Sequence, residues 1–288
     1  MTTIISALMD PTLSFLRNAV LAGILSSILF GILGAIVTVR RVASLAGAIS
    51  HAVLGGIGMA LYLSTTGIVP GLPPVAGALA FAVIAAIIIG LVSLKAKQRE
   101  DTVINAIWAI GMSLGVLFMA RTPGYTDPSS YLFGNILLVS TRDLWLLAAL
   151  DIIVLVITWR FYPQIKLSSF DEEYARVRGI NTHSIFFIIL TITAIAIVLL
   201  QTFVGIVMVI AMLTLPAGTA GFRAKSLWLL MGSAIGWALF FSLGGLAAGW
   251  HFDLPVGAMA VVIAGLVFLV FSAHRALTRK GNKVERKS

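Results

Sequence analysis

One histidine lies well inside a long apolar segment, and its side chain is the first candidate for chemistry. His51 follows Ser50 near the middle of RRVASLAGAISHAVLGGIGMALYL. Imidazole is a common ligand of borderline metals, and ionisable groups inside a membrane usually face a cavity or a partner. Two interpretations follow: His51 contacts an ion on a pathway, or it is a neutral residue hydrogen-bonded to a neighbouring helix.

Asp151 is the only acidic residue deep in an apolar segment, in the stretch LLAALDIIVLVITW. A carboxylate at this depth is costly unless it has a partner or a function. It is a candidate ion ligand or counter-charge on a pathway. The alternative is a protonated or paired structural carboxyl, and both interpretations stay open at this point.

A short polar stretch, KLSSFDEEYARVRGINTH at residues 166–183, has the pattern of one well-capped helix. Ser169, with Glu172 three residues later, matches the capping box. Glu172 and Glu173 fall in the first turn, where the helix dipole favours acids. Gly179 fits the position after the last turn, where glycine ends many helices.

This helix, expected over about residues 168–180, has one apolar face. Phe170, Tyr174 and Val177 recur at i, i+4 and i+7. A helix of this kind can rest on lipid head groups, but its clustered acids disfavour an anionic membrane surface. Docking in a groove of a cytoplasmic protein fits the charge better.

The composition identifies the solvent in which these residues must act. The chain is 59% hydrophobic and 11% charged, whereas a soluble domain carries about 25% charged residues. The bilayer is therefore the expected solvent. The formal net charge of +9 is spread over short gaps between apolar runs, which favours cytoplasmic loops over a nucleic-acid interface. The absence of cysteine excludes disulfides and thiolate metal sites.

The apolar runs predict an all-α polytopic membrane protein with about eight or nine transmembrane helices in a single domain, residues 1–288. A spanning helix needs about 20 apolar residues, and residues 184–221 must supply either two short helices or a re-entrant hairpin. The expected spans are 15–39, 43–63, 73–94, 102–120, 142–161, 184–203, 204–221, 227–249 and 255–274.

The basic residues predict the orientation of the chain. If alternate loops are assigned to one side, that side holds 17 of the 20 Lys and Arg residues, and only Arg17, Arg121 and Arg142 lie on the other. Cytoplasmic loops are enriched in Lys and Arg. The N-terminus is therefore expected outside, with the basic tail 275–288 in the cytoplasm.

Four stretches, taken in order, resemble the metal-importing ABC permeases of the zinc and manganese type. The resemblance covers nearly the whole chain, and it depends on the ordered combination rather than on one motif. The stretches are RR…AISHAVLGG at 40–56, REDTVINAIWAIGMSLGVLF at 99–118, SYLFGNILLVSTRDLWLL at 130–147 followed by SFDEEYARVRGI, and VGIVMVIAMLTLPAGTA at 204–220 with DLPVGA at 253–258.

The resemblance implies the ABC importer permease fold in a bacterial cytoplasmic (inner) membrane. It implies a homodimer of permeases with two cytoplasmic ABC ATPase subunits and an extracytoplasmic metal-binding protein. It makes the 168–180 helix the coupling helix for the ATPase and places His51 on the ion pathway. A divalent metal (Zn, Mn or Fe) is then the transported substrate, with no permanently bound cofactor.

Two positions depart from the pattern of that family. Many members carry an aspartate four residues before the histidine, where this chain has Gly47. Some members carry an acid where this chain has Asn135. Both departures remove negative charge from the expected pathway, so the sequence does not select among the three metals.

Other function classes have weaker support in the sequence. It contains no H-E-x-x-H, G-x-S-x-G or P-loop motif, so neither catalysis nor ATP hydrolysis by this chain is expected. A secondary transporter driven by an ion gradient usually has several charged groups near the middle of the membrane. This chain offers only one His and one Asp for proton coupling, which gives that alternative weak support. An ABC permease for a chelated metal is a further alternative.

Overall fold

The computed structural model describes residues 13–95, 100–124, 129–134 and 136–285, and within these ranges the regular elements are all helices. They are α2 (Ser14–Val39), α3 (Ala43–Thr65), α4 (Pro74–Lys95), α5 (Glu100–Arg121), α6 (Ser129–Phe133), the 3-10 helix η2 (Ile136–Leu138), α7 (Thr141–Phe170), α8 (Glu172–Val177), α9 (Thr182–Val204), α10 (Ile206–Gly221), α11 (Leu227–Phe252) and α12 (Val256–Glu285).

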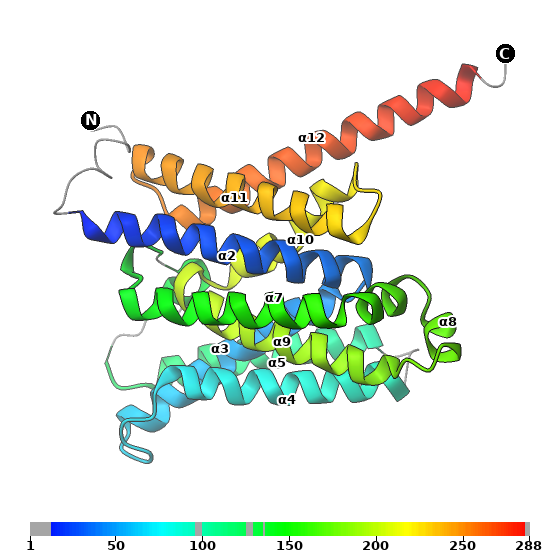
Figure 1. The fold of residues 1–288 in the computed structure, drawn as a ribbon. Helices are drawn as coiled ribbons and strands as arrows, with labels where there is room; N and C mark the ends of the chain where they lie inside the picture. The colour runs from blue at the N-terminus through cyan, green and yellow to red at the C-terminus, as the bar shows by residue number, and fades with distance from the viewer. Residues whose placement is uncertain (1–12, 96–99, 125–128, 135, 286–288) are drawn as a thin grey trace.

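The long helices form one bundle and run back and forth between its two ends (Figure 1). We call the end that carries α8 the α8 end. There Arg40, in the turn after α2, donates a hydrogen bond to Ser168 of α7 (3.3 Å). Arg275 of α12 donates one to the carbonyl of Phe222, just after α10 (3.2 Å). The turns after α2, α7 and α10 therefore lie at the same end.

Among the described residues, eight helices are long and apolar enough to cross a membrane, which agrees with the predicted eight or nine. The segment with two open interpretations is resolved as a 23-residue helix, α9, followed by the 16-residue helix α10. At its start, α10 packs against the Gly134 turn, and it ends beside Arg275 at the α8 end. This segment therefore consists of two helices, and α10 returns the chain to the α8 end although it is shorter than the helices long enough to span a membrane.

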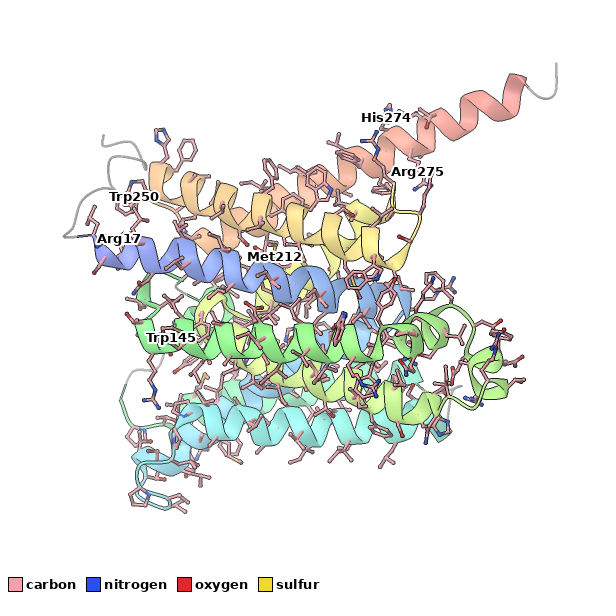
Figure 2. The ribbon with its side chains drawn as sticks, in the orientation of Figure 1. Arg17, Trp145, Met212, Trp250, His274 and Arg275 are labelled. Atoms are coloured by element: carbon pink, nitrogen blue, oxygen red, sulfur yellow. The ribbon has the colours of Figure 1, made fainter. Side chains whose placement is uncertain are left out.

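The prediction that α7 ends near residue 161 is wrong. The helix continues through Pro163 to Phe170. Its 30 residues span about 45 Å, well beyond the hydrocarbon core of a bilayer. Trp145 and Trp159 are 73% and 72% exposed, so both side chains face outward from the bundle (Trp145 in Figure 2). The last turns of α7 therefore project past the membrane.

Glycines allow α3 to pack closely against two neighbours. A side chain at Gly56 would collide with the backbone of Gly77 in α4, and one at Gly58 would meet the backbone of Gly115 in α5. Small residues permit this close approach of membrane helices. These contacts indicate that Gly56 and Gly58 serve helix packing.

The break between α9 and α10 requires glycine. Gly205 has φ 82° and ψ 161°, and an added Cβ would meet the carbonyl oxygen of Leu132 at 2.6 Å. We expect Gly205→Ala to lower the melting temperature of the purified protein by several degrees, because such backbone strain costs about 1–3 kcal/mol. Thermal denaturation in detergent measures this. Gly232→Ala, in open space within α11, is the matched control and should be neutral or stabilising.

Candidate functional site

The predicted pathway histidine lies on a partly open face of α3. His51 is half-buried, and its ring packs edge-on against Trp108 of α5, with 5.1 Å between the ring centroids. Its Nδ1 atom is buried and has no hydrogen-bond partner among the described residues. The alternative of a histidine held by a hydrogen bond from a neighbouring helix therefore has no support at Nδ1.

Gly47 shares this face, one helical turn before His51. No atom lies within 4 Å of where its Cβ would be. The adjacent Ser50 is fully buried, and its hydroxyl donates to the carbonyl of Ala46 (2.9 Å). The Ser50 hydroxyl therefore donates its hydrogen bond within α3. The imidazole of His51 is the main polar group left on this face. Asn135, the other departure from the family pattern, lies outside the described residues.

Asp151 lies on α7 and is only 3% exposed. Neither of its carboxylate oxygens has a hydrogen-bond partner in the described part of the chain. α7 packs mainly on α2 and α9, whereas α3 packs mainly on α4 and α5. Within the described ranges, no group of three His, Asp or Glu side chains is close enough together to hold a metal ion. His51 and Asp151 are therefore separate candidates.

The expected capped helix exists, but it is shorter than predicted and its cap is a different residue. Ser169 still belongs to α7, where its hydroxyl donates to the carbonyl of Ile165 (2.6 Å). Asp171, in extended conformation, caps α8 by accepting a hydrogen bond from the amide of Tyr174 (2.9 Å). The predicted capping box of Ser169 and Glu172 is wrong because α7 continues to Phe170.

The predicted end of this helix is confirmed. Gly179 has φ 77°, and its amide donates to the carbonyl of Arg176. The amide of Ile180 donates to the carbonyl of Ala175, which completes a Schellman motif. α8 is therefore fixed at both ends although it has only six residues.

The prediction that one helix carries all three apolar residues is wrong. Phe170 ends α7 and lines a groove formed with α10, α11 and α12. Tyr174 and Val177 remain on α8, where they are 43% and 85% exposed. Tyr174 also accepts a hydrogen bond from Arg178 (2.9 Å). The exposed apolar surface of α8 thus consists of Tyr174 and Val177.

A polar clamp holds α8 to its neighbours. Glu172 forms an ion pair with Arg176, and both side chains hydrogen-bond the Thr182 hydroxyl at the start of α9 (Arg176 at 3.1 Å, Glu172 at 3.2 Å). Burial alone would raise the pKa of Glu172, but hydrogen bonds from Arg176 and Thr182, with the charges of Arg176 and Arg40, hold it below its ordinary value. The clamp therefore stays charged until the pH falls below the usual range of a glutamate.

Arg40 is the residue that sequence reasoning missed at this end. Its guanidinium packs over the ring of Phe186 (5.4 Å to the centroid) and reaches Ser168. Burial lowers its pKa from the ordinary value, and the charge of Glu172 partly offsets this effect. Only the Glu172–Arg176 spacing of four residues was visible in the sequence as an ion-pair signal.

These features define a multi-pass membrane protein with a partly open histidine face on α3 and a clamped surface helix at one end. Residues 12–275 match the ABC 3 transport family. A probable metal transport system membrane protein of Chlamydia muridarum is 34% identical over 93% of this chain and 90% of its own length. The manganese transport system membrane protein MntC of Listeria monocytogenes is 31% identical over 89% of both chains.

A solved structure supports the same assignment. The PsaBC structure from Streptococcus pneumoniae in complex with Fab superposes with a TM-score of 0.81 at 29% identity, covering 93% of this chain and 94% of that one. The chain therefore belongs to the ABC 3 transport family. The predicted fold class, an all-α permease of the ABC importer type, is confirmed.

Proposed function

We propose that this chain is the membrane-spanning subunit of an ATP-driven importer of divalent metal ions, with Mn²⁺ as the first substrate to test and Zn²⁺ and Fe²⁺ after it. The proposal rests on the position of His51. Its imidazole, a suitable ligand for a borderline metal, lies on a partly open face of a membrane helix. Relatives named for manganese transport support the choice of metal. The metal is cargo, and Asp151 is the second candidate to contact it.

The proposed energy coupling passes through α8 to separate ATPase subunits. The clamp of Glu172, Arg176 and Thr182 ties α8 to α9, and Arg40 links the adjoining end of α7 to α2. A force on Tyr174 and Val177 would therefore reach three long helices. This rigidity supports a docking role for α8.

The proposed assembly contains two copies of this chain and an external metal-binding protein. Trp108, which packs on His51, is 45% exposed in the single chain. A polar group so close to an open face would meet lipid in a monomer, which is unfavourable. A second copy that covers this face would enclose the pathway.

The proposed orientation places the α8 end in the cytoplasm. We expect Lys166→Cys to react with an impermeant thiol reagent only after the membrane is opened, because 17 of the 20 basic residues belong to the loops on this side. The native chain has no cysteine, so labelling has no background. Thr66→Cys, in the turn after α3, is the outward-facing control. Labelling of Lys166→Cys in intact cells would reverse the topology.

Gly47 allows a direct test of the ion pathway. We expect Gly47→Asp to increase the amount of metal retained by the purified complex and to slow uptake, because conduction requires release. The new carboxylate has room and lies one turn from His51. Equilibrium dialysis and radiometal uptake measure the two effects. Gly47→Asn adds similar bulk without charge and should retain less metal.

The proposed function is tested with the full complex in proteoliposomes. Radioactive Mn²⁺ should accumulate only when ATP, the ATPase and the metal-binding protein are all present. Uptake by this chain alone under an ion gradient would favour a secondary transporter. Uptake of a metal chelate in preference to the free ion would favour the chelate permease.

A further inference from the structure

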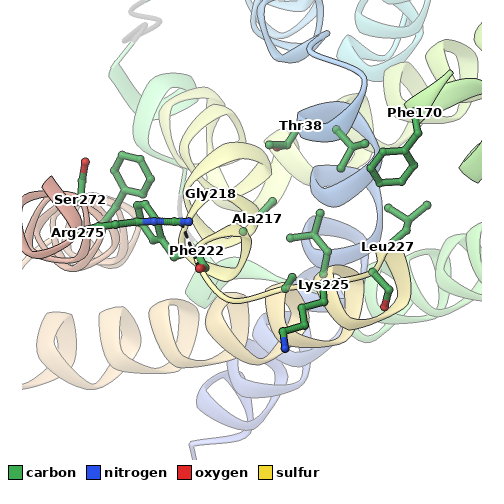
Figure 3. Close-up of a pocket in the computed structure, with 15 residues that line it drawn as sticks. Thr38, Phe170, Ala217, Gly218, Phe222, Lys225, Leu227, Ser272 and Arg275 are labelled. Carbon is green, nitrogen blue, oxygen red and sulfur yellow. Dashed lines mark hydrogen bonds between the residues drawn. The ribbon is translucent and has the colours of Figure 1, made fainter. Parts of the chain in front are cut away.

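A groove opens at the α8 end between α2, α7, α10, α11 and α12 (Figure 3). Its volume is about 570 Å³. Apolar side chains line most of it, among them Phe170, Leu230 and Phe268. Figure 3 shows Arg275 on one side and Phe170 on the other, with the small residues of α10 between them. We call it the α12 groove.

The rim of the α12 groove is basic. Arg275 donates a hydrogen bond to the carbonyl of Phe222 (3.2 Å) and stacks over the Phe222 ring at 5.4 Å, which fixes its guanidinium at the mouth. Lys225 lies on the rim and is exposed. Glu172–Arg176 is the one ion pair within the described ranges, and no lining residue is acidic. Neither rim cation is neutralised by a carboxylate there.

The position of the groove matches the depth of lipid head groups. Leu227 lines it, and the adjacent Trp228 is 52% exposed and stacks on Tyr162 at 4.6 Å, as aromatic residues do at a membrane interface. Beyond Arg275 the sequence adds five basic residues and one acid. The α12 groove has an apolar interior and basic residues at its opening. These features suit a molecule that has both an anionic head and an acyl chain.

We propose that the α12 groove binds one anionic phospholipid, with its phosphate at Arg275 and Lys225 and an acyl chain along Phe268 and Leu230. A free phosphate would make no contact with the apolar interior of the groove. A lipid without an anionic head group would leave Arg275 and Lys225 without a partner of opposite charge. Basic pockets between membrane helices on the cytoplasmic side recognise anionic head groups in this way. The proposed topology places this lipid in the cytoplasmic leaflet.

The test is lipid retention by the purified full-length protein, measured by native mass spectrometry. We expect dioleoylphosphatidylglycerol to be retained at concentrations about tenfold lower than dioleoylphosphatidylcholine. Arg275→Gln should remove most of this preference. Ser272→Phe, which keeps the charge and places bulk in the groove, should lower retention of both lipids. Lys166→Gln makes the same charge change at the same end, outside the groove, and should behave as wild type.

Several results would overturn the proposal. Equal retention of the two lipids would remove the charge argument, and equal loss in Arg275→Gln and Lys166→Gln would indicate a diffuse basic surface. Displacement of the lipid by glycerol 3-phosphate at similar concentrations would indicate a simple anion site. Loss of dimers in Ser272→Phe without loss of lipid would assign the groove to a second copy of the chain. Size-exclusion profiles establish that each variant is folded, and the readout does not depend on metal transport.

Discussion

His51→Ala is expected to reduce ATP-dependent metal uptake by at least about tenfold, which corresponds to about 1.4 kcal/mol of lost interaction with the ion in transit. The imidazole is the main polar group on its face of α3, because Gly47 supplies no ligand and the Ser50 hydroxyl donates its hydrogen bond to the carbonyl of Ala46. Protein yield and oligomeric state should change little, since His51 is only half-buried. Radiometal uptake into proteoliposomes measures the effect.

A size-matched variant separates a pathway role from a structural one. His51→Leu restores bulk against Trp108 but supplies no ligand, so uptake should remain as low as in His51→Ala. A structural histidine would give the opposite pattern, with poor expression of the alanine variant and recovery with Leu or Gln. Wild-type uptake in either variant would remove His51 from the pathway and make Asp151→Asn the next experiment.

The sequence predicted the helices well wherever length and composition decide. Apolar runs of about 20 residues predicted the spans. For residues 184–221 they left two alternatives, and the structure shows the break at Gly205, whose backbone conformation suits glycine. The error came at α7. The expected span ended at residue 161, but the helix continues through Pro163 to Phe170. Tertiary packing at the α8 end decided this, and no local pattern shows it.

The same limit applies to the candidate sites. His51 lies within a long helix and Gly179 ends α8, as predicted, because both features depend on local sequence. The role of His51 stays a prediction. The cap was assigned to Ser169 instead of Asp171, since both residue types favour that position and only the end of α7 distinguishes them. Arg40 contributes through contacts more than a hundred residues away in sequence, which spacing alone does not reveal.

Glu172→Arg is expected to uncouple ATP hydrolysis from transport. The substitution breaks the ion pair with Arg176 and the bond to Thr182, and it places a third cation near Arg40. α8 should then lose its fixed position relative to α9, so force from the ATPase would no longer reach the membrane helices. The ratio of metal transported to ATP hydrolysed, measured in proteoliposomes, should fall severalfold, because an exposed ion pair with a charge-assisted hydrogen bond contributes on the order of 1 kcal/mol.

Tyr174→Ala tests the surface that α8 presents, separately from the clamp. Removal of an aromatic interface anchor can cost about 2 kcal/mol or more, so less ATPase should co-purify with the permease. Tyr174→Phe loses only the hydroxyl that accepts from Arg178, and it should retain the ATPase because the ring supplies the contact area. Glu172→Arg should affect coupling more than retention, and Tyr174→Ala should do the reverse. Unchanged complex yield and unchanged uptake for both variants would mean that α8 does not contact the ATPase.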